Sequence, residues 1–83
     1  MNTISIAYDS VGTGHETLVG EVSRLIGEVV LNDVQAEAEG HRGMMCSGTL
    51  KVLTEMAAED VQEVLDDVAS DYMANGLFLW AQA

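Results

Sequence analysis

Apolar and polar residues alternate near the start of the chain, where Ile4, Ile6 and Tyr8 are separated by single smaller residues. A period of two is typical of a strand, because successive side chains point to opposite faces. We therefore predict a strand over residues 3–8. Residues 9–12 read Asp-Ser-Val-Gly, a composition that favours a turn.

The next segment has helical spacing. Thr13 and Glu16 form a T-x-x-E capping box, which predicts the N-terminus of a helix. Apolar residues then recur every three or four positions as far as about Leu31, so we predict a helix over this stretch. Its apolar face consists of Leu18, Val22, Leu25, Ile26 and Val29. Gly20, Ser23 and Gly27 form a stripe of small residues on the opposite face, which either suits the close approach of another backbone or reflects drift in a small protein.

The middle of the chain returns to alternation. Residues 34–39 predict a half-exposed strand at the edge of a sheet. Residues 40–43, Gly-His-Arg-Gly, predict a turn, and residues 44–54 predict a longer strand. We expect a bulge in this longer strand at Ser47-Gly48.

A second helix is predicted over residues 57–74. Its apolar stripe consists of Val61, Val64, Leu65, Val68 and Tyr72. Asn75-Gly76 predicts a left-handed cap at its C-terminus. Residues 77–81, Leu-Phe-Leu-Trp-Ala, predict a closing strand that is apolar on both faces.

The predicted element order is β-α-β-β-α-β within a single domain, residues 1–83. Two right-handed βαβ halves joined by a hairpin predict an α+β, ferredoxin-like fold. Both helices would cover one face of a four-stranded antiparallel sheet, with the first and third strands central and the second and fourth at the edges. An irregular α+β fold is the alternative, since the pattern of apolar and polar residues that predicts secondary structure is weakest over residues 33–54.

Charge is the most informative feature for function. The chain has 3 Lys and Arg residues against 14 Asp and Glu, a formal net charge of −11, and no Lys, Arg or His after Lys51. Because 48% of the residues are hydrophobic, we expect a folded protein and not a disordered acidic tail. Such an acidic protein repels nucleic acid and anionic membranes, so we expect its partners to be basic protein surfaces or cations.

Seven carboxylates lie on or beside the second predicted helix, with no basic residue among them. They are Glu55, Glu59, Asp60, Glu63, Asp66, Asp67 and Asp71. Like charges at this helical spacing cost roughly 0.2–0.5 kcal/mol per pair, so selection for stability alone would add Lys or Arg. Their linear density, one charge per roughly 3.5–4 Å, is close to the one per about 3.4 Å of a DNA strand. The series predicts a partner-binding face that mimics DNA.

Two other interpretations of the acidity stay open. The helix could present a solvated face that keeps the protein soluble, or the chain could be adapted to a high-salt cytosol. Salt-adapted proteins usually reduce their large apolar content, whereas this chain keeps 48% hydrophobic residues.

The closing strand predicts a second contact surface. Phe78 and Trp80 point to one side of the strand, and Leu77 and Leu79 to the other. Because the helices would cover only one face of the sheet, one of these two pairs must lie outside the core. We read the exposed pair as a contact surface for a partner or a homodimer, unless loops or the N-terminus cover it.

No motif for catalysis or metal binding is present in the sequence. His15, His41 and Cys46 do not fall into C-x-x-C or H-x-x-x-H spacing. The segment that ends at Cys46, Gly-Met-Met-Cys, is similar to the G-M-x-C of heavy-metal-associated domains, but Thr49 stands where those domains carry a second cysteine. We expect no enzymatic activity, no metal and no cofactor, with Cys46 acting as a small buried hydrophobe.

The same features bear on localisation. A single cysteine allows no internal disulfide, which fits a reducing compartment. The N-terminus has no signal-peptide pattern, and the longest apolar run is too short to span a membrane. We therefore expect a cytoplasmic protein.

Residues 4–12, Ile-Ser-Ile-Ala-Tyr-Asp-Ser-Val-Gly, followed by a predicted helix, resemble the first strand and D-x-x-G turn of ACT regulatory domains. The proline that usually precedes the glycine of that turn is absent here. The resemblance implies a small-molecule-sensing dimerisation module of the same β-α-β-β-α-β order, with an amino acid bound at the dimer interface.

In size, acidity and lack of a catalytic motif, the whole chain resembles the small anti-CRISPR proteins of phages and mobile elements. The resemblance implies a non-enzymatic inhibitor that acts in the cytoplasm of the host cell. Its partner would be a Lys/Arg-rich host protein, a type I CRISPR surveillance complex. The acidic series from Glu55 to Asp71 would occupy the path of the DNA, with Glu16, Glu21 and Glu28 on the first helix adding charge.

Overall fold

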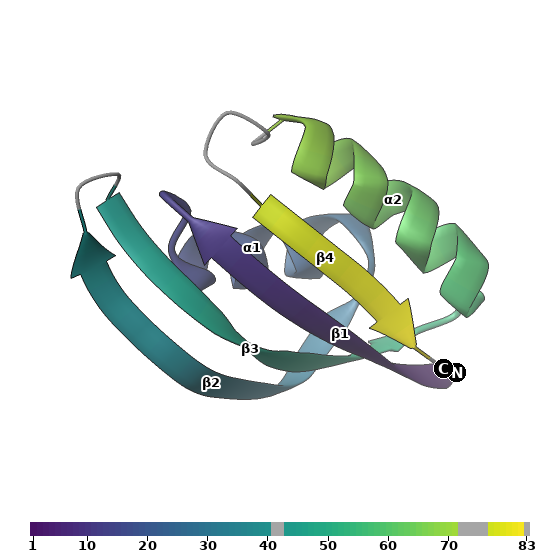
Figure 1. Cartoon of the computed structure of the whole chain (residues 1–83). Coiled ribbons are helices and arrows are strands. Elements are labelled where there is room, and N and C mark those ends of the chain that lie inside the picture. Colours follow the sequence, from purple (N-terminus) through teal and green to yellow (C-terminus); the bar gives the residue numbers. More distant parts are fainter. Residues whose placement is uncertain (41–42, 72–76, 83) are drawn as a thin grey trace.

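The computed structural model describes residues 1–40, 43–71 and 77–82, with the backbone alone for residues 44, 77 and 78. Its elements, in chain order, are β1 (Asn2–Val11), α1 (His15–Leu25), β2 (Glu28–Gly40), β3 (Gly43–Thr54), α2 (Ala58–Asp71) and β4 (Leu77–Gln82) (Figure 1). This order is the one that the hydrophobic pattern predicts. No helix among these described stretches is long and apolar enough to cross a membrane.

The four strands form one antiparallel sheet in the order β2-β3-β1-β4. The first and third strands are therefore central and the second and fourth lie at the edges, as the sequence predicts. β1 pairs with β3 without interruption from Asn2↔Thr54 to Val11↔Met45. β4 pairs with the second half of β1, from Ser5↔Gln82 to Ser10↔Leu77.

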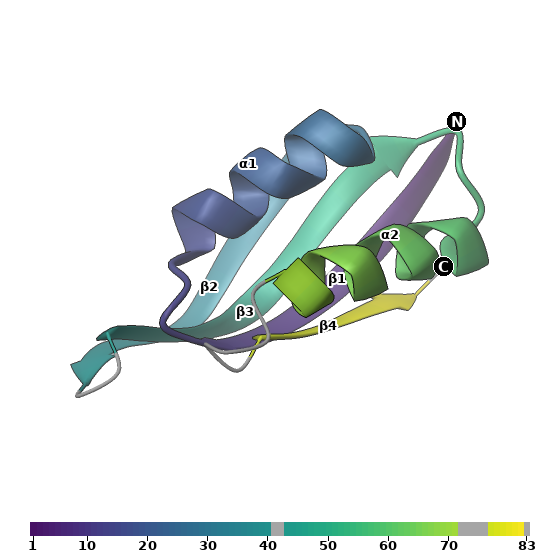
Figure 2. The same cartoon turned by 90° about the horizontal axis from the view of Figure 1, so that it is seen from above.

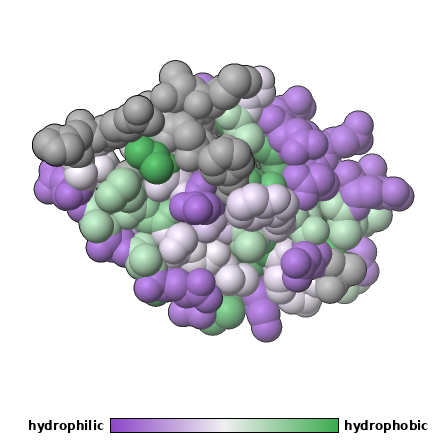
Figure 3. Space-filling model, viewed as in Figure 1, coloured by the Kyte–Doolittle hydropathy of each residue, from purple (hydrophilic) through white to green (hydrophobic). Residues whose placement is uncertain are grey.

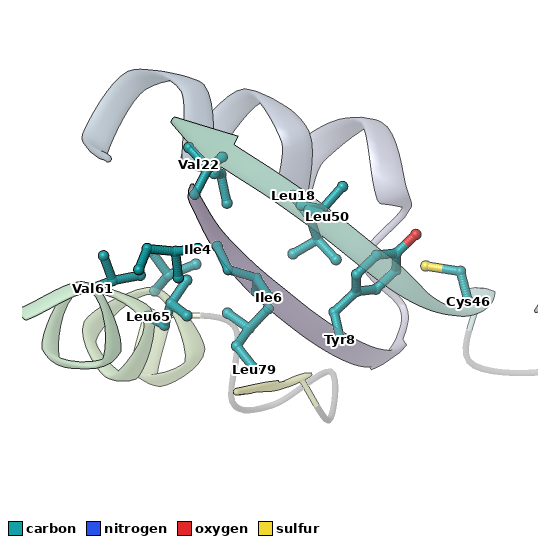
Figure 4. Close-up of a cluster of buried hydrophobic side chains, with 12 residues drawn as sticks. Ile4, Ile6, Tyr8, Leu18, Val22, Cys46, Leu50, Val61, Leu65 and Leu79 are labelled. Atoms are coloured by element: carbon teal, nitrogen blue, oxygen red, sulfur yellow. The ribbon is translucent and has the colours of Figure 1, made fainter. Parts of the chain in front are cut away.

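Both helices lie on the same face of this sheet (Figure 2). Alternation in β1 directs Ile4, Ile6 and Tyr8 to that face, where all three are buried. Leu18 and Val22 of α1 cover the core from above β3 and β1 (Figure 4). From α2 the buried side chains are Val61, Leu65 and Val68. Each fully buried side chain of this kind stabilises the fold by about 1.5–3 kcal/mol.

The first helix is shorter than predicted. It ends at Leu25, and β2 begins at Glu28, so the predicted extension to Leu31 is wrong. Val29 does face the core, but as a strand residue paired with Val52. The reason is non-local, because the β-branched pair at 29–30 gains more from the ladder with β3 than from another helical turn.

The chain turns from helix to strand at Gly27, which is therefore not part of a helical small-residue face. A Cβ at Gly27 would collide with the carbonyl oxygen of Leu53 on β3. Around Gly20, by contrast, a Cβ would meet nothing within 4 Å. The predicted close backbone approach is thus correct for Gly27 and wrong for Gly20.

The capping box is also wrong. The N-cap of α1 is Gly14, and no side chain makes a capping hydrogen bond to the helix. The Thr13 side chain is buried, and its hydroxyl finds no hydrogen-bond partner. The helix starts one residue later than predicted because Thr13 is drawn into the interior.

The second strand is longer than the predicted 34–39, and it is largely exposed. Its register against β3 shifts between Val29 and Leu31 and again between Val34 and Ala36. The second irregularity lies opposite Ser47-Gly48, where a bulge is predicted, but the extra residue belongs to β2 and not to β3. The edge position predicted for this strand is confirmed.

At the C-terminal end, α2 covers Ala58–Asp71 of the predicted 57–74. Tyr72, the last residues of that prediction and the cap at Asn75-Gly76 lie outside the described residues. β4 matches the predicted closing strand and extends it by one residue to Gln82.

Two glycine substitutions test the close packing of the sheet. At Gly48, a Cβ would collide with the carbonyl oxygen of Asp33 and with the Tyr8 hydroxyl. We expect Gly48→Ala to lower the free energy of unfolding by about 1–3 kcal/mol, the cost of overpacking. Gly20→Ala, in the open interior of α1, should raise it by about 0.5–1 kcal/mol through helix propensity. Urea unfolding followed by circular dichroism measures both, and equal effects of the two variants would contradict the packing described for Gly48.

Candidate functional site

The outer side of α2 carries the largest group of carboxylates in the described part of the chain. Six of the seven predicted residues lie on this helix, and all six are exposed. We call them the acidic face: Glu59, Asp60, Glu63, Asp66, Asp67 and Asp71. At about 100° per residue they span roughly 140° of the helix circumference, on the side away from the buried stripe.

Glu55, the seventh predicted residue, does not lie on the helix. It occupies the bend between Thr54 and Ala58, where it is exposed. The acidic face is therefore shorter than the stretch from Glu55 to Asp71. From Glu59 to Asp71 it covers about 18 Å of axis, which still gives one charge per roughly 3–4 Å.

Cations are scarce around these carboxylates. Among the described residues, Arg24 forms an ion pair with Glu21 at 2.7 Å, and the Nδ1 of His15 lies 3.6 Å from Glu37, a pair that is ionic only when the imidazole is protonated. Neither pair includes a residue of the acidic face or Glu55. Asp66 accepts a hydrogen bond of 2.9 Å from the Gln62 side chain, which is neutral. The negative charge of this surface is therefore not neutralised within the described part of the chain.

A shallow hollow lies on this face. Met56 and Val64 contribute its apolar surface, and its charged lining consists of Asp60, Glu63, Asp66 and Asp67. Its volume is about 530 Å³. Val64, which belongs to the predicted buried stripe, is only half-buried. The hollow is wide open to solvent, so it suits contact with a protruding cationic side chain better than enclosure of a small molecule.

Gln62 fixes the orientation of the acidic face. Its Nε2 donates to the carbonyl oxygen of Leu79 at 3.1 Å, and its Oε1 accepts from the Ala81 amide at 2.7 Å. These are backbone groups of β4, an edge strand that pairs only with β1. One side chain thus joins α2 to the sheet and blocks part of an exposed strand edge. The sequence carried no signal for this role.

The remaining acids lie on other elements. Glu16 and Glu21 are on α1, as predicted, and Glu21 is engaged by Arg24. Glu28 is wrongly placed by the sequence analysis, since it opens β2. Together with Asp33, Glu37 and Glu39 it makes β2 acidic as well.

The predicted second contact surface is described in part. Leu79 of β4 is buried in the core, so the alternate side of the strand faces away from the helices. Trp80 lies on that side and is 50% exposed. The side chain of Phe78 lies outside the described residues, although its backbone pairs with Asp9.

A small polar cluster lies under the start of α1. Ser10 donates a hydrogen bond of 2.6 Å to the carbonyl oxygen of Thr13, and the Cys46 thiol approaches the same oxygen at 3.4 Å. The Tyr8 hydroxyl and the Nδ1 of His15 are buried without a hydrogen-bond partner. No group of three or more His, Cys, Asp or Glu side chains in the described stretches could hold a metal ion.

Burial controls the protonation of this cluster. It raises the pKa of the Cys46 thiol, and the nearby carboxylates of Glu37 and Asp9 raise it further, against a smaller opposing effect of the His15 backbone. Burial also raises the pKa of Tyr8, with smaller contributions from Cys46 and Glu37. Cys46 is thus a neutral, buried thiol at physiological pH and a poor nucleophile.

Comparison with protein-family models, with curated proteins and with solved structures finds no match for this chain.

The attachment of α2 to β4 can be tested at Gln62. Gln62→Ala leaves the Ala81 amide and the Leu79 carbonyl without their side-chain partner, so we expect the free energy of unfolding to fall by about 1–3 kcal/mol. Gln62→Glu keeps an acceptor for the Ala81 amide but places a carboxylate oxygen against Asp66 and the Leu79 carbonyl, so at neutral pH it should destabilise at least as much as Gln62→Ala. Hydrogen exchange of the Ala81 amide should accelerate in Gln62→Ala; unchanged protection would refute this account.

The raised thiol pKa predicts a pH dependence of stability. A group whose pKa is higher in the folded state contributes stability that is complete below its unfolded pKa and is lost as pH rises through the folded value. The free energy of unfolding should therefore fall as pH increases above about 8.5, the ordinary thiol range, before Tyr8 contributes near about 10. In Cys46→Ala this first decline should be absent. Denaturant titrations at a series of pH values measure the slope, and an equal slope in the variant would contradict the assignment.

Proposed function

We propose that this protein is a non-enzymatic acidic inhibitor that binds the basic groove of a nucleic-acid-binding complex as a DNA mimic. The observation that supports the proposal is the acidic face of α2, with six exposed carboxylates on one helix and no ion pair to any of them among the described residues. A groove lined by Lys and Arg attracts such a face for the same electrostatic reason that it attracts phosphates. We further propose that the element order and strand order correspond to the ferredoxin-like fold.

The partner that we propose is a type I CRISPR surveillance complex, so that the protein acts in the cytoplasm of a host cell as an anti-CRISPR protein encoded by a phage. Support comes from the resemblance of the whole chain to that class in size and acidity. The proposal also requires that α2 be presented rigidly, and the double hydrogen bond from Gln62 to β4 supplies this rigidity.

Binding to a purified type I surveillance complex tests the proposal. Replacing Glu63, Asp66 and Asp67 by Gln, Asn and Asn removes three charges from the acidic face while keeping side-chain shape. We expect affinity to fall at least about tenfold, because the paired cations of the groove lose their partners. The matched control replaces Glu28, Asp33 and Glu39 of β2 by Gln, Asn and Gln. It also removes three negative charges but leaves the acidic face intact.

The inhibitor should compete with target DNA for the complex, and its affinity should fall as salt is raised. Surface plasmon resonance with and without target DNA measures both effects. Equal binding by the two triple variants would show that α2 is not the docking face. Simultaneous binding of DNA and inhibitor would exclude the mimic mechanism.

A thermal melt at two salt concentrations separates this function from salt adaptation. The DNA mimic should remain folded at low ionic strength, since its acidic helix is anchored by Val61, Leu65 and Val68 in the core. A salt-adapted protein should unfold when salt is withdrawn. Loss of the folded signal below about 50 mM salt, where screening lengths exceed about 10 Å, would favour adaptation.

An ACT-like sensor is the alternative function, and one observation favours it. A hollow of about 330 Å³ lies at the start of α1, lined by Gly14, His15, Glu16, Thr17 and Glu37. It follows directly on the Asp9–Gly12 segment that resembles the ACT motif, although Asp9–Val11 of the turn predicted there form the end of β1. A rise in melting temperature with one of the twenty amino acids would support the sensor; no response to any of them would leave the inhibitor as the better proposal.

A further inference from the structure

The two edges of the sheet differ in what covers their backbone. At the outer edge of β4, the Gln62 side chain makes hydrogen bonds to the carbonyl oxygen of Leu79 and the amide of Ala81. At the outer edge of β2, no strand of the described chain pairs with the backbone, and residues 35–39 are all exposed. This end of β2 extends with β3 past the start of α1 (Figure 2). β2 is therefore the edge to which another strand can be added.

The register of the sheet shows which residues of β2 point their backbone groups outward. In a strand, the N–H and C=O groups of successive residues point toward opposite neighbours. The Ala81 amide points away from β1, toward Gln62. Carried across β1 and β3, this alternation turns the backbone groups of Ala36 and Ala38 toward β3. Glu37 and Glu39 therefore point their N–H and C=O groups to the free edge.

Carboxylates accompany these free backbone groups. The side chains of Glu37 and Glu39 lie on the same side of the sheet, because alternate residues of a strand share a face. Oε1 of Glu37 lies 3.6 Å from the Nδ1 of His15, and Glu39 takes part in no ion pair among the described residues. β2 as a whole contains four Asp and Glu residues and no Lys, Arg or His. Hydrophilic residues lie along this rim and, as a separate group, over α2 (Figure 3).

We propose that the edge formed by residues 36–40 of β2 binds an extended, basic segment of a partner protein by strand addition, with Lys or Arg at every second position of that segment. The residues opposite Glu37 and Glu39 exchange backbone hydrogen bonds with them, with Cα atoms about 5.5 Å apart. Side chains directly opposite each other share a face of the sheet. A cation at each of these two positions therefore meets a carboxylate.

Charge selects this occupant over a second copy of the chain. A symmetric antiparallel pair of β2 edges, centred on Ala38, would place Glu37 of one copy opposite Glu39 of the other. Like charges directly opposite each other destabilise a strand pair. The net charge of −11 on each copy adds to this repulsion. The same carboxylates attract a basic segment, so the edge rejects its own copy and accepts a strand of opposite charge.

A bulge limits the length of the contact. The register of β2 against β3 shifts between Val34 and Ala36, so a regular added strand covers only residues 36–40. The outward-facing groups within this stretch are the N–H and C=O of Glu37 and Glu39. Because the contact is short, we expect weak binding, with a dissociation constant between about 10 µM and about 1 mM.

This edge is separate from the acidic face. α2 is attached to β4, which lies at the opposite edge of the sheet from β2. A basic peptide is attracted to both surfaces, so the experiment must show which backbone amides respond to it. Strand addition also depends on the peptide backbone, whereas attraction to the acidic face depends on charge alone.

An NMR titration of the isotope-labelled full chain with a blocked heptapeptide, in which Thr and Lys alternate, tests the proposal. We expect saturable chemical-shift changes at the amides of Glu37 and Glu39. Methylation of the Lys backbone nitrogens removes the donors that face β2, so it should abolish these changes. The matched control peptide has the same number of methyl groups on Thr nitrogens, which face away from β2. It keeps the charge of the first peptide and should still bind.

Variants of the protein test the charge requirement. Replacing Glu37 and Glu39 by Gln should raise the dissociation constant of the alternating peptide roughly threefold to tenfold, as expected for two cross-strand ion pairs. The matched control replaces Glu28 by Gln and Asp33 by Asn, which removes the same charge from the part of β2 before the bulge. It should change the dissociation constant less than about twofold. Circular dichroism establishes that both variants are folded.

Three results would overturn this inference. The first is an absence of shift changes at Glu37 and Glu39 with peptide up to about 5 mM. The second is equal binding of the two methylated peptides, because binding would then depend on charge alone. The third is a set of changes confined to α2, which would agree with the proposed function and exclude the β2 edge. Failure of the protein to bind a surveillance complex would leave the β2 titration unaffected, so the two proposals fail separately.

Discussion

Burial of both helices on a single face of the sheet is the constraint on which the rest of the molecule depends. Ile4, Ile6 and Leu50 provide the central strip of that face, and each helix closes the core with two or three apolar side chains. The outer sides of the helices remain free for charge, whereas the other sheet face receives neither helix. The largest group of carboxylates therefore lies on the helix side of the molecule, whereas the other sheet face carries fewer charged side chains.

The acidic helix is tolerated because burial outweighs repulsion. Like-charge pairs along α2 cost roughly 0.2–0.5 kcal/mol each. Burial of Val61, Leu65 and Val68 contributes about 1.5–3 kcal/mol per side chain. The two hydrogen bonds from Gln62 to β4 add a directional attachment. The helix can therefore carry six exposed carboxylates on its outer side and still pack firmly against the sheet.

The amino-acid sequence by itself determined the element order, the core face of β1, the buried stripe of α2 and the position of the acids on its outer side. Each of these follows from the spacing of neighbouring residues, since a period of two or of 3.6 assigns side chains to faces without reference to the rest of the chain. The lack of cations after Lys51 is likewise a property of the sequence alone.

At some positions a local pattern fits more than one conformation, and there only the tertiary structure decided the outcome. Val29 fits a helical stripe equally well, but pairing with Val52 makes it a strand residue. Leu79, and not Trp80, faces the core because the pairing of β4 with β1 sets that choice. Gln62 joins α2 to the edge of the sheet because β4 lies within hydrogen-bond distance of its side chain. Such outcomes depend on contacts between residues far apart in the chain, which local spacing does not encode.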